Sequence, residues 1–156
     1  MRRLLIAVVA VIGVGVVLTG CSATPPQPDV TFYSDGESVR ATPFVLFDIE
    51  SRTQEQHREA IVRLDMRPGQ PVQVSVSNEI AKEPWGVAFS YINRDGRRVD
   101  ASSKVFLPKD KRHAYTLELP NADDRLELAA VQRMAIVNGD KLVQTGYWVL
   151  AAQDVV

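Results

Sequence analysis

The sequence is poor in the residues that build covalent cross-links and metal sites. Its 156 residues include one cysteine, Cys21, and two histidines, His57 and His113. A lone cysteine cannot form a disulfide within the chain, so stability has to come from an apolar core. Tetrahedral zinc needs about four closely spaced His, Cys or acidic ligands. The sequence therefore predicts no metal site and no other cofactor, and we expect both histidines to be exposed.

Recognisable catalytic motifs are also missing. The sequence has no Gly-x-Ser-x-Gly element, no phosphate-binding loop and no glycine-rich dinucleotide turn. Asp123 and Asp124 stand directly before a predicted strand and read as a turn. Asp48 and Glu50 share one face of an extended stretch, a spacing that suits a cation or a general acid but is commoner on a solvated face. We predict that the protein is not an enzyme.

The charge balance gives no reason to expect a nucleic-acid partner. The formal net charge is −1 for the whole chain, and removal of the N-terminal segment with Arg2 and Arg3 would take it to −3. A nearly neutral domain lacks the positive field that attracts polyanions. Beyond residue 18, no apolar run approaches the roughly twenty residues that span a bilayer as a helix.

The first residues have the order of an export signal. Two arginines follow Met1, an uninterrupted apolar run covers residues 4–18, and two small residues precede Cys21. The ending Leu18-Thr19-Gly20-Cys21 resembles the bacterial lipobox. This resemblance implies cleavage before Cys21, with diacylglycerol on its sulfur and an acyl chain on its new amino group. A plain signal peptide, an uncleaved anchor or a buried free thiol at Cys21 are the alternatives.

These features predict how the chain is divided. Residues 1–20 are a signal peptide, and residues 21–29 are a lipidated cysteine followed by a proline-rich tether. Three prolines within residues 25–28 favour an extended polyproline conformation. Residues 30–156 form the folded domain, which we expect on the extracytoplasmic face of the cell membrane.

Short alternating segments dominate residues 30–156. The valines of residues 72–76 alternate with polar residues, which is typical of a strand with one face in the core and one in water. The pairs Asp95-Gly96 and Asn138-Gly139 favour tight hairpins, because such turns need positive φ. We also expect an exposed loop at residues 51–59, a strand at 105–107 and a bulge near 129–131.

About seven or more short strands with turn residues between them predict an all-β domain, an antiparallel β-sandwich. Trp85 stands early in a central strand, and the last hairpin follows a long strand, which favours an immunoglobulin-like layout. Because the usual inter-sheet disulfide is absent, the Trp85 indole is expected to pack on aliphatic side chains. A small β-barrel is the alternative.

Several short motifs resemble a known family. They are Val30-Thr31-Phe32-Tyr33-Ser34-Asp35-Gly36, Pro84-Trp85-Gly86-Val87, Tyr115-Thr116-Leu117-Glu118-Leu119-Pro120 and Trp148-Val149-Leu150. Together with the lipobox and the tether they are similar to an uncharacterised group of actinobacterial lipoproteins, over almost the whole chain. The resemblance implies a location and a fold, and it implies no reaction.

Two groups of side chains are candidates for a binding surface. One is a basic set within residues 93–113: Arg94, Arg97, Arg98, Lys104, Lys109, Lys111 and Arg112. If the loops that carry it lie at adjacent ends of the sandwich, it forms a patch suited to anionic lipid head groups or acidic wall polymers. Otherwise it protects an edge strand from aggregation. The other group is aromatic, and core packing competes with a ligand groove as its role: Phe44, Phe47, Tyr147 and Trp148.

These observations favour a membrane-anchored, non-catalytic binding or assembly module of the cell envelope. One version is an accessory subunit that docks on an envelope protein through a sheet edge. A small envelope hydrolase or metal-binding enzyme is the first alternative, and a ligand carrier is the second.

Overall fold

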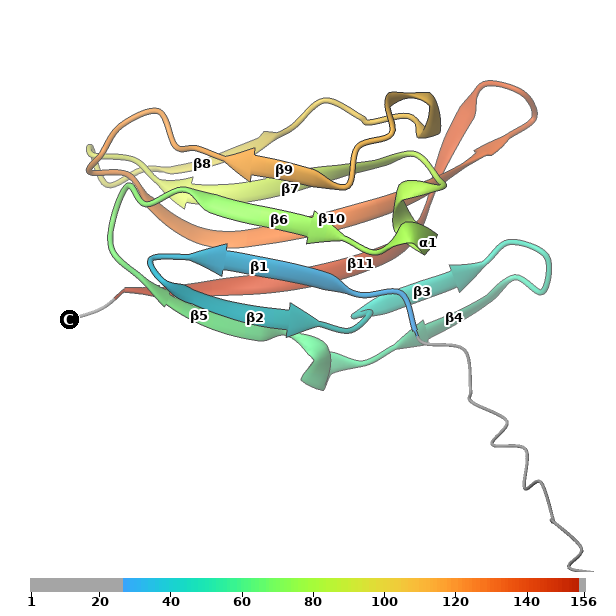
Figure 1. Cartoon of the computed structure of the whole chain (residues 1–156), viewed down its shortest axis with the longest axis horizontal. Helices are drawn as coiled ribbons and strands as arrows, with labels where there is room; N and C mark the ends of the chain where they lie inside the picture. Colours follow the sequence, from blue (N-terminus) through green and yellow to red (C-terminus); the bar gives the residue numbers. More distant parts are fainter. Residues whose placement is uncertain (1–26, 155–156) are drawn as a thin grey trace, which may run out of the picture.

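Residues 27–154 of the protein, described by a computed structural model, form two β-sheets that pack face to face (Figure 1). The predicted signal peptide and lipidation site at Cys21 lie outside the described residues. The strands are β1 (Val30–Ser34), β2 (Glu37–Ala41), β3 (Val45–Asp48), β4 (Thr53–Gln56), β5 (Val62–Met66), β6 (Val72–Val76), β7 (Trp85–Ile92), β8 (Arg98–Ser102), β9 (Ala114–Leu117), β10 (Arg125–Val137) and β11 (Lys141–Asp154). The helical elements are α1 (Asn78–Ala81) and two 3₁₀ turns, Arg58–Ala60 and Pro108–Asp110.

The strand order confirms the predicted sandwich. One sheet has the order β2-β1-β6-β9 and the other β4-β3-β11-β10-β7-β8, with β5 paired to β11 in parallel. Immunoglobulin domains face an A-B-E sheet with a G-F-C sheet, and here β1-β6-β9 face β11-β10-β7 in the same chain order. The β2 strand, the β3–β4 hairpin and β5 are additions between the first two strands of that pattern. No strand pairing joins the two sheets within the described residues, so they do not close into a barrel.

Alternation of side chains builds the core from both sheets. On β6 the valines of residues 72–76 are buried and the residues between them are exposed, as the sequence predicts. Trp85 on β7 is 1% exposed, and its ring lies 4.7 Å from the ring of Phe106, centroid to centroid. Trp148 on β11 is fully buried beside Gly146, where a Cβ would stand 2.8 Å from the indole. A glycine is therefore needed at 146 to leave room for that ring.

Two predictions of strand position are wrong. Residues 53–56, expected in a loop, form β4, whose four residues are all exposed. This strand extends beyond the body with water on both faces, so it shows no alternation in sequence. Residues 105–107 are not a strand, since only Phe106 bridges to Trp85, while β8 ends at Ser102. The side chain of Phe106 is buried, and its backbone N–H and carbonyl oxygen both bond to Trp85, at 2.7 and 3.0 Å.

The register of β10 also differs from the prediction. The expected bulge at residues 129–131 is absent, and the pairing shifts at Glu127 against β7 and at Thr145 of β11 against β10. Glu127 lies between two leucines and Thr145 lies between Gln144 and Gly146, so no common residue pattern marks the two shifts. The Asn138-Gly139 hairpin is confirmed, and both residues have positive φ, 54° and 91°.

Candidate functional site at one end of the sandwich

The structure divides the basic set between opposite ends of β8. Arg94, Arg97 and Arg98 lie at the β7–β8 turn, whereas the other four residues follow the far end of β8. Five residues of extended strand separate the two groups by about 16 Å. All seven side chains are exposed. The seven residues therefore form two surfaces and not one continuous patch.

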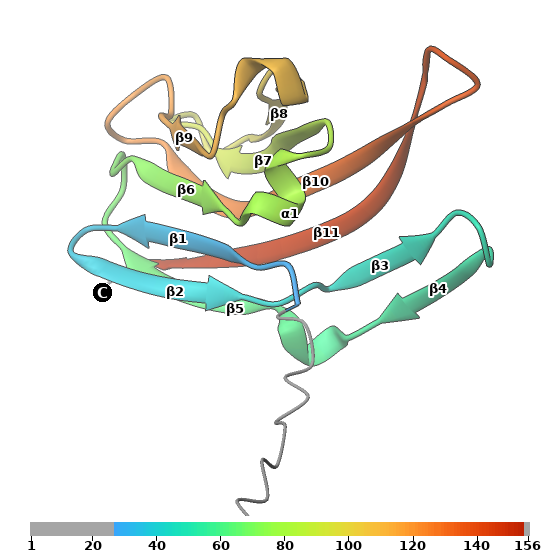
Figure 2. The ribbon, with the colours of Figure 1, turned by 45° about the vertical axis from the view of Figure 1, so that its right-hand side comes forward.

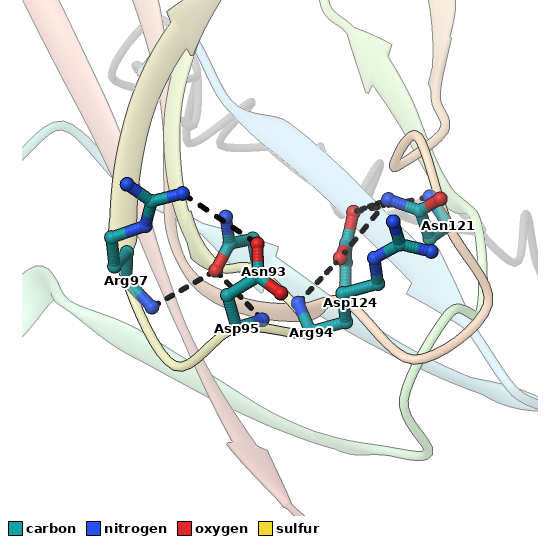
Figure 3. A network of polar contacts seen from close by, with 6 residues as sticks. All are labelled: Asn93, Arg94, Asp95, Arg97, Asn121 and Asp124. Carbon is teal, nitrogen blue, oxygen red and sulfur yellow. Dashed lines mark hydrogen bonds and ion pairs between the residues drawn. The ribbon is translucent and has the colours of Figure 1, made fainter.

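Acidic neighbours offset part of the charge at the β7–β8 turn. The ion pairs are Arg97 with Asp95 at 3.6 Å, and Arg98 with Asp100 at 3.4 Å and Glu127 at 3.7 Å. The side-chain oxygen of Asn93 accepts hydrogen bonds from the backbone N–H groups of Asp95 and Arg97, which shapes the turn (Figure 3). Acidic side chains therefore neutralise part of the positive charge of Arg97 and Arg98.

Asp124 braces the same end from inside. Its side chain is fully buried and accepts hydrogen bonds from the backbone N–H of Arg94 at 3.0 Å and of Asn121 at 3.0 Å (Figure 3). The Asn121 side-chain amide donates to it as well, at 3.1 Å. The carboxylate thus joins the β7–β8 turn to the loop before β10. Asp123 and Asp124 do form the predicted turn, but the burial of Asp124 gives no signal in the sequence.

At the other end, Lys104 and Arg112 flank a hollow with an aromatic floor. Lys104 Nζ lies 5.8 Å and Arg112 Cζ 6.0 Å from the centre of the Phe106 ring, within the range of cation–π attraction. Tyr115 completes the floor, its ring 5.7 Å from that of Phe106. The hollow has a volume of about 530 Å³ and no acidic residue lines it. An anion would meet two cations there.

The loop that carries this hollow is held by specific contacts. The Asp110 carboxylate accepts a hydrogen bond from the Leu107 backbone N–H at 2.8 Å, which closes the 3₁₀ turn. Lys111 then takes a left-handed conformation with φ of 48°. The Trp85 indole N–H donates to the carbonyl oxygen of Arg112 at 3.2 Å. Among residues 27–154, Lys104, Lys109, Lys111 and Arg112 make no ion pair with an acidic side chain.

The chain enters the sandwich at this same end. The Trp148 indole N–H donates to the carbonyl oxygen of Pro28 at 2.9 Å, and the Ser77 N–H donates to that of Asp29 at 3.0 Å. The residue before Ser77, Val76, donates its N–H to the carbonyl oxygen of His113 at 2.9 Å. Through these bonds the first described residues lie close to the basic loop. We call this the tether end of the sandwich.

The other predicted candidates, Asp48, Glu50 and His57, do not come together in a site. The Asp48 carboxylate accepts hydrogen bonds from the backbone N–H groups of Glu50 and Ser51, at 2.8 and 2.9 Å, and these hold its pKa below the ordinary value. It closes the β3–β4 turn and does not join Glu50 in a cation site. His57 lies on the surface between Glu55 and Glu59, with 43% of its side chain exposed. No group of three potential metal ligands occurs in the described part of the chain.

The predicted aromatic group contributes both to the core and to a small cavity. Trp148 is a core residue, while Phe44, Phe47 and Tyr147 are half-buried. A cavity of about 330 Å³ lies between the β3–β4 hairpin and Arg133, with Leu46 and Phe47 in its wall. Arg133 stacks over the Trp148 ring at 5.8 Å, and burial lowers its pKa. Sequence reasoning missed Arg133, although an arginine inside the largely apolar run of residues 128–137 was a usable signal.

The fold and its surfaces define a β-sandwich with a basic hollow beside the point where the chain enters. Residues 23–153 match the family described as "Protein of unknown function (DUF2771)", and the chain belongs to that family. It is similar to uncharacterized proteins of Mycobacterium bovis and of two Mycobacterium tuberculosis strains. Each is 29% identical over 116 residues, which cover 72% of this chain and 67% of the relative. No solved structure matches. The predicted resemblance to a family of uncharacterised proteins is thus confirmed.

No helix within residues 27–154 is long and apolar enough to cross a membrane.

Proposed function

We propose that the protein is an extracytoplasmic lipoprotein, anchored in the cell membrane through Cys21, whose sandwich serves as a non-catalytic binding or assembly module of the envelope. The export-signal pattern of residues 1–20 and the lipobox ending at Cys21 support the anchor. The domain's part in binding rests on the tether end described above.

The observation that carries this proposal is that the chain enters the sandwich at the end with four cations. Within the described residues, none of these four makes an ion pair with an acidic side chain. An anchored domain would hold Lys104, Lys109, Lys111 and Arg112 toward the membrane, because Pro28 and Asp29 enter beside their loop. Each basic residue near an anionic surface contributes about 1 kcal/mol, and the attraction fades within a Debye length. The proposed ligand class is therefore the anionic head groups or acidic polymers at the membrane surface.

The anchor is tested by changing Cys21→Ala in the full chain. We expect the variant to lose lipid addition and the cleavage that depends on it, which changes its mass and releases it from the membrane fraction. Stable anchoring requires at least two acyl chains, so wild type should stay in that fraction through high-salt washing. A variant that is processed and fractionates like wild type contradicts the lipoprotein proposal.

The binding role is tested with unlipidated protein of residues 22–156 and vesicles. Changing Lys104, Lys109 and Arg112 to Gln should reduce co-sedimentation with anionic vesicles by roughly two orders of magnitude in partition coefficient, at about 1 kcal/mol per residue. Lys111 is left unchanged because its positive φ complicates substitution. The matched control changes Arg94, Arg97 and Arg98 to Gln, with the same loss of charge.

The two triple variants distinguish the tether end from the β7–β8 turn as the membrane-binding surface. We expect the control to keep most of its binding, and binding of wild type to fall as salt rises. Equal losses for the two triple variants, or equal recovery with neutral vesicles, would reject a membrane-facing tether end. The domain would then be better sought as a module that binds proteins through its sheet edges.

The alternative of a ligand carrier is favoured by one observation, the cavity beside Arg133. The Arg133 guanidinium donates to the hydroxyl oxygen of Thr145 at 3.1 Å and makes no ion pair within the described residues. A small anion with an apolar part suits this cavity, although Asp48 and Glu55 also line it. A hydrolase or metal-binding enzyme stays an alternative without a specific group of residues to carry it.

A further inference from the structure

The end of the β10–β11 hairpin projects beyond the body of the sandwich. β7 pairs with β10 only as far as Arg133, and β3 meets β11 only at Gly146 and Tyr147. From Ala135 to Val143 the hairpin is therefore a two-stranded ribbon without a neighbouring strand. Figure 2 shows this ribbon rising past α1, apart from the β3–β4 hairpin that also projects on this side.

The tip of this ribbon is apolar. Ile136 and Leu142 face each other across the two strands, and their side chains are 53% and 41% exposed. Single exposed aliphatic residues are ordinary on protein surfaces, but here an isoleucine and a leucine stand side by side on a projecting ribbon, and about half of each is exposed. Asp140 and Lys141 stand at the turn, so the tip carries no net charge.

The ribbon points away from the body at the tether end. Arg133, where the ribbon begins, stacks on Trp148, and Trp148 is hydrogen-bonded to Pro28. The five steps along the extended chain from Arg133 to Asn138 span about 17 Å. The seven steps from Cys21 to Pro28 reach at most about 25 Å when fully extended. The length of the ribbon from Arg133 to its tip is thus roughly two thirds of the longest distance that the tether allows between the domain and its anchor.

We propose that the tip of the β10–β11 hairpin contacts the lipid bilayer, with Ile136 and Leu142 entering its interfacial layer. This inference rests on the proposed lipid anchor at Cys21. Apolar burial drives this contact, so it is insensitive to salt, unlike the contact proposed for the basic loop. The β3–β4 tip is a weaker candidate, because Asp48 and Glu50 flank Ile49 there.

The test places one fluorophore at each end of the membrane-bound lipoprotein. Asn138→Cys carries an environment-sensitive label at the tip, and Asp95→Cys carries the same label at the β7–β8 turn. Lipid on the Cys21 sulfur leaves the introduced thiol as the one that reacts. In bilayers with brominated acyl chains we expect the label at 138 to be quenched at least twofold and blue-shifted at 0.1 M and 1 M salt alike, and the label at 95 to be unchanged.

Two further variants separate tip contact from folding. Changing Ile136 and Leu142 together to Ser should remove more than half of the quenching at 138. Leu128→Ser, which alters an exposed residue elsewhere on β10, should not change it. Circular dichroism of each variant checks that the sandwich is intact.

The other outcomes overturn the inference in distinguishable ways. If the protein stays in the membrane fraction but the label at 138 behaves like that at 95, the tip contact is wrong and the anchor stands. If the protein leaves the membrane fraction, both proposals fail. A blue shift at 138 that persists in detergent and rises with protein concentration would assign the tip to contact between copies of the chain.

Discussion

The Trp85 indole N–H is hydrogen-bonded to the carbonyl oxygen of Arg112, at 3.2 Å. The same ring is 1% exposed and packs on Phe106, which forms the floor of the basic hollow. One side chain therefore fills the core and also fixes the loop that carries the cations. Stability of the domain and geometry of its candidate binding surface are coupled at this residue.

Two substitutions of Trp85 should separate these roles. Trp85→Ala removes a buried aromatic side chain and should lower the free energy of unfolding by about 3–5 kcal/mol. Trp85→Phe keeps most of the packing but loses the bond to Arg112, worth about 0.5–1.5 kcal/mol. Denaturant unfolding measures both. Hydrogen exchange in Trp85→Phe should also accelerate at residues 108–113, and unchanged exchange there would show that other contacts hold the loop.

Removal of the buried carboxylate at 124 should destabilise the domain. Asp124→Ala leaves the backbone N–H groups of Arg94 and Asn121 without their acceptor, at a cost of about 1–3 kcal/mol for each unsatisfied buried group. Asp123→Ala is the matched control, since Asp123 is exposed and should change stability by less than about 0.5 kcal/mol. Similar unfolding midpoints for the two variants would contradict the bracing role of Asp124.

Acid should weaken the contact between the β1–β2 turn and the chain after β5. Arg67 Nε donates to the Asp35 carboxylate at 2.8 Å, and this bond lowers the pKa of Asp35 below its ordinary value of 3.8. Because the folded pKa lies below the unfolded one, the contribution is complete above pH 3.8 and disappears as pH falls through the lowered folded pKa.

Asp35→Asn tests this dependence. Asn tolerates the positive φ of 52° at this position, so the backbone turn should survive. The variant should be less stable than wild type at neutral pH, and the difference should shrink as pH falls below 3.8. High salt should reduce it too, because the pair lies at the surface. A stability difference that stays constant with pH would assign the effect to the turn and not to the ion pair.

The sequence by itself determined the sandwich and much of its core. Alternation along β6, the Asn138-Gly139 turn and the burial of Trp85 each depend on local chain geometry, in which side chains of a strand point to opposite faces and certain turns need positive φ. The export-signal and lipobox predictions belong to residues outside 27–154 and stay predictions.

Only the tertiary structure decided where charged residues meet. Arg98 and Lys104 are six positions apart in sequence, but β8 carries them to opposite ends of the sheet. Asp124 is buried because the β7–β8 turn, thirty residues earlier, folds over it. Arg133 gains its place over Trp148 through strand pairing with β11. Such relations follow from strand order and register, which link distant segments, and no local pattern of residues contains them.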